Sequence, residues 1–293
     1  DRAASSARKA GCGSDANIDC DTDVDISALT GRPQHQEDDD DAPVPLTQLI
    51  ANFQGLNPPV IHGLLREGET MNIIASSKVG KSWLVGSLAS CIASGMDWLG
   101  FGIEQGKVLL IDNELHTNCF TSRYIQIAEA MGVKSKLFSD NIDVKILRGK
   151  LKDLHALGRF FKKIPPETYK VVIIDAFYRT LPIGTDENDN GQIANLYNLL
   201  DNLAMRISCS FILIHHASKG NQATKSVTDV GAGAGSQSRA ADSHLILRPH
   251  EDDNTVVLEA EVRSFRPIEP LVLRREHPLF VPDQMADATA LKG

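Results

Sequence analysis

The feature that most constrains how this chain can fold is a series of short, continuous apolar runs separated by longer segments of helical periodicity. The apolar runs are residues 71–75, 107–113, 143–147, 169–175 and 210–216. The helical segments are residues 83–95, 120–132, 154–164 and 192–208. A strand that is apolar along its whole length is buried on both faces, which is typical of a parallel sheet covered by helices on both sides. The sequence therefore predicts an α/β fold with a mainly parallel, twisted sheet.

The pattern changes after residue 240. The stretches SHLILRP (243–249), TVVLEAEVRSF (255–265) and PLVLRRE (270–276) are strand-like and are separated by short polar segments. Short connections favour antiparallel neighbours, so we expect these strands to be added to the sheet as antiparallel strands at the C-terminal end. One domain, residues 46–282, accommodates all of these elements, and residues 283–293 are expected to form a flexible tail.

The first 45 residues have a different composition from the rest. They contain eleven Asp or Glu and four Lys or Arg, which gives −7 of the net charge of −8. The remainder carries only about −1, so the overall acidity does not exclude a nucleic-acid partner. The segment has few large apolar side chains and cannot bury enough surface to offset its ordering entropy. We expect a disordered acidic arm; a role as an acidic interaction arm is the alternative.

Composition also bears on location. No apolar run approaches the roughly 18 residues of a membrane span, so no membrane partner is expected. The five cysteines are scattered and include no C-x-x-C pair, which argues against a disulfide framework or a zinc ribbon. This cysteine usage fits a reducing cytoplasm, and Cys91 and Cys209 lie in apolar stretches that suit small core residues.

The stretch ASSKVGKS (75–82) joins the first apolar run to a helical segment. It matches the phosphate-binding motif G-x-x-x-x-G-K-[ST], except that Ala75 replaces the first glycine. In this context backbone N–H groups and a helix N-terminus converge on phosphates. Lys81 would reach the β- and γ-phosphates, and the Ser82 hydroxyl would ligate Mg²⁺. The nucleotide-binding candidates are Ser76, Ser77, Lys78, Val79, Gly80, Lys81 and Ser82. The alternative is a strand-to-helix turn that contains these letters by chance.

Two further apolar runs end in acidic residues. Asp175 ends VVIID, at a strand end where a carboxylate can hold Mg²⁺; a helix-capping role is the alternative. LLIDNE places Asp112 and Glu114 at another strand end. We predict that Glu114 is the general base that activates water and that Asp112 is a supporting or capping group. Exposed loop carboxylates are the alternative.

The run SFILIHH ends in His215 and His216. Adjacent residues on a strand point to opposite faces, so only one of the pair can face a nucleotide and sense its γ-phosphate. The alternative is a structural pair of histidines. A zinc site is disfavoured because no third ligand has suitable spacing.

The long Gly- and Ala-rich stretch 218–239 and the arginines that follow it are the remaining candidates. Lys219, Lys225 and Arg239 are candidates for contact with phosphodiesters, and a plain surface loop is the alternative. An arginine can also neutralise charge on the γ-phosphate across a subunit boundary. Arg263, Arg266 and Arg248 compete for that role, and surface arginines on edge strands are the alternative.

These motifs, in this order, resemble the RecA-like P-loop ATPases, in particular the branch of the RepA-type hexameric plasmid helicases and the DnaB- and KaiC-like proteins. ASSKVGKS is similar to Walker A, LLIDNE to the strand of the catalytic glutamate, VVIIDAFYR to Walker B and ILIHHASKG to the sensor segment. The resemblance implies ATP and Mg²⁺ as cofactors, and hydrolysis at interfaces of a homo-oligomeric ring, a hexamer, that moves on single-stranded DNA. In that picture His216 is the sensor and Arg263 acts in trans.

Two other classes of function stay open on the sequence. A nucleotide-dependent regulatory or assembly ATPase of the KaiC-like kind is favoured by the acidic arm and by the acidic stretch LPIGTDENDN after the Walker B-like segment. A small-molecule kinase would use the same loop, but such enzymes usually carry an arginine-bearing lid that is not recognisable in this sequence.

Overall fold

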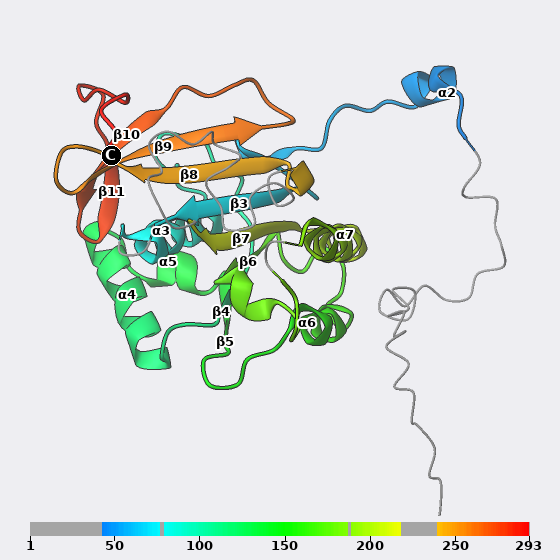
Figure 1. Ribbon diagram of the computed structural model, residues 1–293, viewed down its shortest axis with the longest axis horizontal. Coiled ribbons are helices and arrows are strands. Elements are labelled where there is room, and N and C mark those ends of the chain that lie inside the picture. The colour runs from blue at the N-terminus through cyan, green and yellow to red at the C-terminus, as the bar shows by residue number, and fades with distance from the viewer. Residues whose placement is uncertain (1–42, 77–78, 187–188, 218–238, 293) are drawn as a thin grey trace, which may run out of the picture.

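The apolar runs form the centre of one mixed, nine-stranded sheet. The computed structural model describes residues 43–76, 79–186, 189–217 and 239–292. The strand order is β11-β10-β9-β8-β3-β7-β6-β4-β5, which can be followed in Figure 1. The parallel strands from the five runs are β3 (Thr70–Ala75), β4 (Val108–Asp112), β5 (Ile142–Ile146), β6 (Val171–Asp175) and β7 (Ser210–His216). The predicted α/β class is confirmed.

Helices cover both faces of this sheet, because alternate side chains of each buried strand point to opposite faces. On one face, α3 (Lys81–Ser94), α4 (Thr117–Ala130) and the short α5 (Lys136–Ser139) pack in a core that includes Ile73 and Leu110. On the other face, α6 (Leu154–Phe161) and α7 (Asn190–Ile207) pack in a core that includes Ile111 and Ile174. Cys91 and Cys209 are buried in these two cores, as expected.

The prediction for the late strands was wrong in one respect. β8 (Ser243–Pro249) was expected to be antiparallel, but it pairs parallel to β3. Residues 217–242 separate β7 from β8, and a connection of that length permits the crossover that a parallel neighbour requires. The strands β9 (Thr255–Val262), β10 (Leu271–Glu276) and β11 (Leu279–Pro282) then follow as antiparallel neighbours, as predicted.

Several short elements were not predicted. β1 (Pro59–Ile61) and β2 (Leu65–Arg66) form a separate two-stranded ribbon, and the 3-10 helix η1 (Phe177–Thr180) directly follows β6. Helix α2 (Leu46–Ala51) lies apart from the sheet in Figure 1 and has no buried residue. None of the helices that the structure describes is both long and apolar enough to cross a bilayer.

Both ends of the chain were predicted to lie outside the folded domain. Residues 1–42 of the expected disordered arm are outside the described part of the chain. In the expected tail, the N–H of Lys292 donates to the carbonyl of Pro249 (3.0 Å), and the carbonyl of Ala290 accepts from the N–H of Glu251 (2.9 Å). The tail therefore has backbone partners at the end of β8.

The order of the central strands determines where a site can form. β3, β7, β6 and β4 are consecutive neighbours, so their carboxyl ends lie side by side. The register pairs Ala75 with His216 and Asp112 with Asp175. In open α/β sheets, ligands bind in the crevice outside the carboxyl ends of the strands.

Candidate nucleotide-binding site

The turn between β3 and α3 is built around Gly80. Gly80 is the N-cap of α3 with φ 96°, a backbone conformation that side chains other than glycine rarely adopt. Its carbonyl accepts from the N–H groups of Trp83 (2.9 Å) and Leu84 (3.1 Å), which begins the helix. The first N–H groups of α3 therefore point toward the end of the parallel sheet, in the arrangement that binds phosphate.

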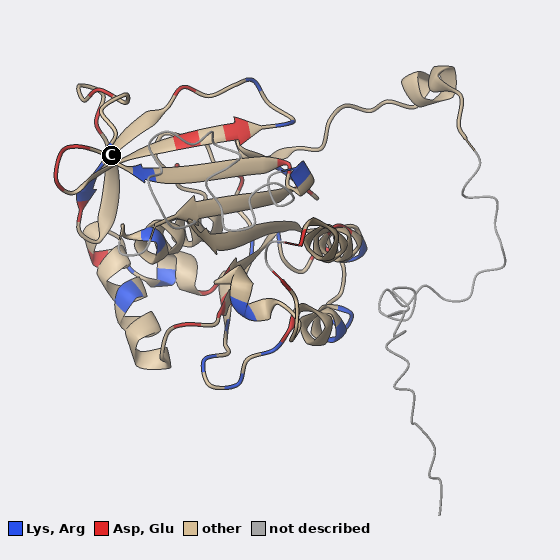
Figure 2. Cartoon of the chain, in the orientation of Figure 1, with Lys and Arg blue, Asp and Glu red and all other residues tan. Residues whose placement is uncertain are grey.

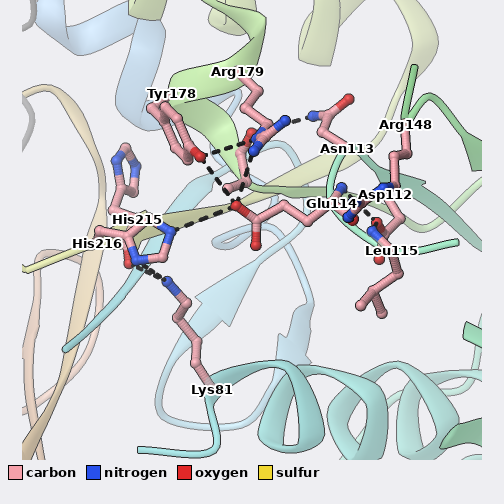
Figure 3. Close-up of polar contacts among 11 residues, drawn as sticks. Lys81, Asp112, Asn113, Glu114, Leu115, Arg148, Tyr178, Arg179, His215 and His216 are labelled. Atoms are coloured by element: carbon pink, nitrogen blue, oxygen red, sulfur yellow. Dashed lines mark hydrogen bonds and ion pairs between the residues drawn. The ribbon is translucent and has the colours of Figure 1, made fainter. Parts of the chain in front are cut away.

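Lys81 is buried, and its ammonium group lies against the end of β7. Its Nζ donates to the carbonyl oxygen of His215 at 2.8 Å and to Nδ1 of His216 at 3.2 Å (Figure 3). Burial lowers the pKa of Lys81, while the negative charges of Asp175 and Glu114 partly offset this effect. A buried cation whose described hydrogen bonds are to neutral acceptors is well placed to receive an anion.

Asp175 lies at the end of β6 and is buried. Its Oδ1 is enclosed and has no hydrogen-bond partner among the residues that the structure describes. Burial raises the pKa of Asp175 to about 6; the charge of Lys81 opposes this rise, and Asp112 and Glu114 add to it. An orphaned, enclosed carboxylate oxygen beside a phosphate-binding turn fits a role in holding a divalent cation.

Glu114, in the turn after β4, is surrounded by donors. Its Oε1 accepts from the Tyr178 hydroxyl at 3.2 Å and lies 3.6 Å from Nε of Arg179 and 3.7 Å from Nε2 of His216 (Figure 3). These contacts, that with His216 foremost, lower the pKa of Glu114 to about 2 although partial burial opposes the shift. The carboxylate is therefore ionised and oriented. Arg148 also donates to the backbone carbonyl of Glu114.

Asp112 supports the same turn. Its Oδ1 accepts from the backbone N–H groups of Glu114 (2.8 Å) and Leu115 (2.7 Å), so it has the capping role that was predicted as one of two options. Burial raises the pKa of Asp112, and these two hydrogen bonds counteract the rise. The side chain holds the backbone that carries Glu114.

The two histidines at the end of β7 point in opposite directions, as the strand geometry predicts. His215 is buried on the α7 side, where Nε2 lies 3.1 Å from Oδ1 of Asn72 and 3.3 Å from the Tyr197 hydroxyl. Burial lowers the pKa of His215 to about 3, so its ring is neutral. His216 faces the cleft between Lys81 and Glu114.

A cleft of about 260 Å³ collects most of these residues. The predicted residues in its wall are Ser76, Gly80, Lys81, Ser82, Glu114 and His216. Three residues in the wall were not predicted, namely Trp83, Arg123 and Arg275. Trp83 and Arg123 lie on the helices that follow two of the motifs, which is a signal that could have found them. No local signal marks Arg275, because only the strand order brings β10 to this turn.

The remaining predicted residues are placed elsewhere or are not described. Val79 lines a second hollow beside the cleft. Ser77, Lys78, Lys219 and Lys225 lie outside the described residues.

The three competing arginines differ in their surroundings. Arg263 follows β9, whose end pairs with the start of β8, so it lies at the opposite edge of the sheet from the cleft of its own chain. Its guanidinium contacts Asp242 (3.2 Å) and the carbonyl of Arg239 (2.8 Å). Arg266 is exposed, and Arg248 is buried in an ion pair with Glu259 (2.9 Å). Burial of Arg248 argues against a role that requires it to reach another subunit.

The fold and the cleft together define the class of protein. A phosphate-binding turn after a central parallel strand, with acidic residues and a histidine at the neighbouring strand ends, is the arrangement of a RecA-like P-loop ATPase. Residues 43–222 match the model of the AAA_25 family, which is described as an AAA domain. The match spans more than half of the chain, and the chain belongs to this family.

Solved structures agree with this assignment at the level of the fold. One of them, the ATPase domain of a DnaB-like helicase, has a TM-score of 0.56 and 15% sequence identity, and the match covers 80% of this chain and 95% of that one. A DnaB-like replicative helicase, solved in a study of its interactions with primase, has a TM-score of 0.57 and 16% identity, with 83% and 68% covered. This chain therefore has the fold of DnaB-like helicase ATPase domains.

Proposed function

We propose that this chain is a RecA-like motor domain that binds and hydrolyses ATP with Mg²⁺. The observation that carries the proposal is the contact of His216 with both Lys81 and Glu114, because it brings the phosphate-binding turn and two other strand ends into one cleft. We place the ATPase domain at residues 46–282. Under this proposal Ser76 to Ser82 form the phosphate-binding loop.

Each residue has a role that its surroundings support. The backbone N–H groups of the loop and the Lys81 ammonium bind the phosphates, and Lys81 neutralises charge as it develops. The Ser82 hydroxyl and the Asp175 carboxylate would hold Mg²⁺, which supplies charge neutralisation at the phosphate oxygens when it is bound. Glu114 orients a water molecule for in-line attack and accepts its proton. His216 would detect the γ-phosphate, because it already contacts both Lys81 and Glu114.

We further propose that the domain works in a homo-oligomeric ring, a hexamer, on single-stranded DNA, in the manner of the RepA-type helicases. Arg263 lies at the far edge of the sheet from the cleft, which suits a residue that completes the site of a neighbouring subunit. Lys219, Lys225 and Arg239 are the proposed DNA contacts in the stretch after His216. The scattered cysteines support a cytoplasmic location.

A basic region supports a nucleic-acid partner. Lys and Arg residues cluster on the connection between β5 and α6 and on α6 itself (Figure 2). The exposed members are Arg148, Lys150, Lys152, Arg159 and Lys163. The single acidic residue in 145–163 is Asp153, so the charge of this region is opposite to that of residues 1–45.

A nucleotide-dependent regulatory or assembly ATPase of the KaiC-like kind is the second candidate. The net charge of −7 on residues 1–45 favours it, because an acidic arm repels DNA and suits a protein partner. Nucleotide-dependent association without any effect of DNA would select this candidate.

The test of the first proposal is ATP turnover measured with and without single-stranded DNA. The wild-type chain should hydrolyse ATP, DNA should stimulate hydrolysis, and Lys81→Ala should abolish it. Sedimentation with an ATP analogue should show a ring. A wild-type chain without turnover, or Lys81→Ala with full turnover, would refute the proposed ATPase, whereas a monomer under all conditions would refute the ring.

A further inference from the structure

The β10–β11 hairpin, far from the sequence motifs, packs directly on the phosphate-binding turn. A Cβ placed on Gly80 would lie 2.8 Å from the ring of Phe280 on β11, so this ring covers the glycine. His277, between the two strands, makes an edge contact with Trp83 at 4.7 Å between ring centroids and an interplanar angle of 82°. The hairpin is therefore fixed to the residues on either side of Lys81 and Ser82.

Arg275 is presented to the cleft by the same hairpin. It pairs across the ladder with Phe280, and its backbone N–H donates to the carbonyl of Asn254 at 2.7 Å. Its Nε lies 3.4 Å from the position of a Cβ on Gly80, and its side chain lines the cleft together with Lys81 and Ser82. The guanidinium group is thus held beside the turn by main-chain pairing and by an aromatic neighbour.

The surroundings of Arg275 differ from those of the arginine next to it. Arg274 is exposed and pairs with Glu276 at 2.7 Å and with Asp283 at 3.6 Å. The Nε of Arg275 is enclosed and has no hydrogen-bond partner among the described residues. A buried donor without a partner is unfavourable, and a guanidinium group binds phosphate oxygens well. The turn that Arg275 touches is itself an anion-binding element.

We propose that Arg275 is a phosphate-binding residue of the nucleotide site, supplied by the same chain as the P-loop. This inference rests on the proposed function. Because Arg275 packs on Gly80, in the loop whose N–H groups cradle the α- and β-phosphates, its contact is with phosphates that ATP and ADP share. The edge hairpin then registers whether a nucleotide is bound, while His216 and Glu114 act at the γ-phosphate.

The experiment compares Arg275→Gln with Arg274→Gln in the full chain by calorimetric titration of Mg-ADP and of a slowly hydrolysed Mg-ATP analogue. Arg275→Gln should weaken both nucleotides alike, by about 10- to 100-fold, which corresponds to the loss of one charged hydrogen bond. Arg274→Gln should stay within about twofold of wild type, since its partners lie on the surface. Arg275→Lys should restore part of the affinity, because it keeps the charge but loses the planar group.

The outcomes separate this inference from the proposed function. If wild type binds no nucleotide, the proposed function itself fails. If wild type binds and Arg275→Gln binds equally well, or weakens only the ATP analogue, the assignment of Arg275 fails alone. If Arg275→Gln loses stability without nucleotide but keeps the nucleotide-induced shift in melting temperature, Arg275 is structural and the inference is overturned.

Discussion

The Nε2 atom of His216 lies 3.7 Å from Oε1 of Glu114, and the other nitrogen of the same ring lies 3.2 Å from Nζ of Lys81. A lysine ammonium group can only donate, so Nδ1 of His216 accepts and the ring hydrogen lies on Nε2, directed to Glu114. A single neutral ring therefore connects the phosphate-binding lysine with the carboxylate. A ligand that engages Lys81 changes the hydrogen bonding of this ring.

Replacement of His216 tests that connection. His216→Ala should lower the ATP turnover number by about 10²-fold, because it removes an oriented donor beside the reacting phosphate. Nucleotide affinity should change by less than about threefold, since Lys81 and the loop remain. Steady-state turnover and equilibrium titration of an ATP analogue measure the two quantities separately.

The matched control is His62→Ala. His62 also pairs with a glutamate, Glu104 at 3.3 Å, but on the surface, and its loss should leave turnover unchanged. Equal turnover in His216→Ala and wild type would show that the ring is only structural.

Glu114→Gln should separate binding from hydrolysis. The amide keeps the size of the side chain but cannot accept a proton from water, so turnover should fall by at least about 10³-fold. Binding of Mg-ATP should stay within about threefold, and the variant should be trapped with bound nucleotide. Glu104→Gln, a surface change, is the control. A Glu114→Gln enzyme with wild-type turnover would exclude this residue as the base.

Lys81→Met should abolish nucleotide binding without harming the fold. Burial lowers the pKa of Lys81, which means that its charge is disfavoured in the nucleotide-free protein. The apolar side chain removes that cost, so the melting temperature without nucleotide should stay equal or rise. Lys136→Met, at an exposed pair with Asp140, should change neither property. A large fall in melting temperature would instead assign Lys81 a structural role.

Much of this site could be predicted from local sequence, because each motif lies at the end of an apolar run. The ends of β3, β4, β6 and β7 carry Lys81, Glu114, Asp175 and His216 within a few residues, and parallel pairing brings such ends together. The direction of β8 could not be predicted, since strand-like composition does not distinguish parallel from antiparallel pairing. Arg275 could not be predicted because its position depends on the order of the whole sheet.

The contacts of Glu114 show a different limit. Tyr178 and Arg179 follow the acidic strand end directly, in the segment DAFYR. Their approach to Glu114 depends on η1, a short turn of 3-10 helix that no periodicity announces. The sequence contains the residues, but the geometry of one turn decides which carboxylate they meet.

The pKa of Asp175, raised to about 6 mainly by burial, predicts how Mg-nucleotide binding depends on pH. A protonated carboxyl does not hold Mg²⁺, so affinity should be constant above about pH 7 and fall as the pH drops through 6. Glu114, with a pKa of about 2, stays ionised over this range and cannot cause the change. Calorimetric titrations between pH 5 and 8 measure the profile.

Asp175→Asn is the control for that profile. The variant should bind Mg-nucleotide more weakly at pH 8 and show a flatter profile, while protonation of the nucleotide itself affects both proteins alike. The folded pKa lies above the unfolded value of 3.8, so ionised Asp175 destabilises the fold as the pH rises through this interval. Asp175→Asn should therefore be more stable than wild type at pH 8, on the order of 1–3 kcal/mol, with a smaller gain at pH 4.5. Equal stability differences at both values would contradict the assignment.

The position of Arg263 predicts how variants should complement one another. Arg263 lies at the edge of the sheet opposite its own cleft, so in a ring it would serve the site of a neighbouring subunit. Arg263→Ala and Glu114→Gln should each lack turnover alone, because one lacks the arginine and the other lacks the base. In a mixture, an interface between an Arg263→Ala cleft and a Glu114→Gln neighbour combines an intact cleft with an intact arginine, so turnover should reappear. Arg266→Ala, an exposed neighbour, should be active without a partner. If Arg263 acted within its own chain, every subunit in the mixture would lack one group, and no ratio of the two variants would restore hydrolysis.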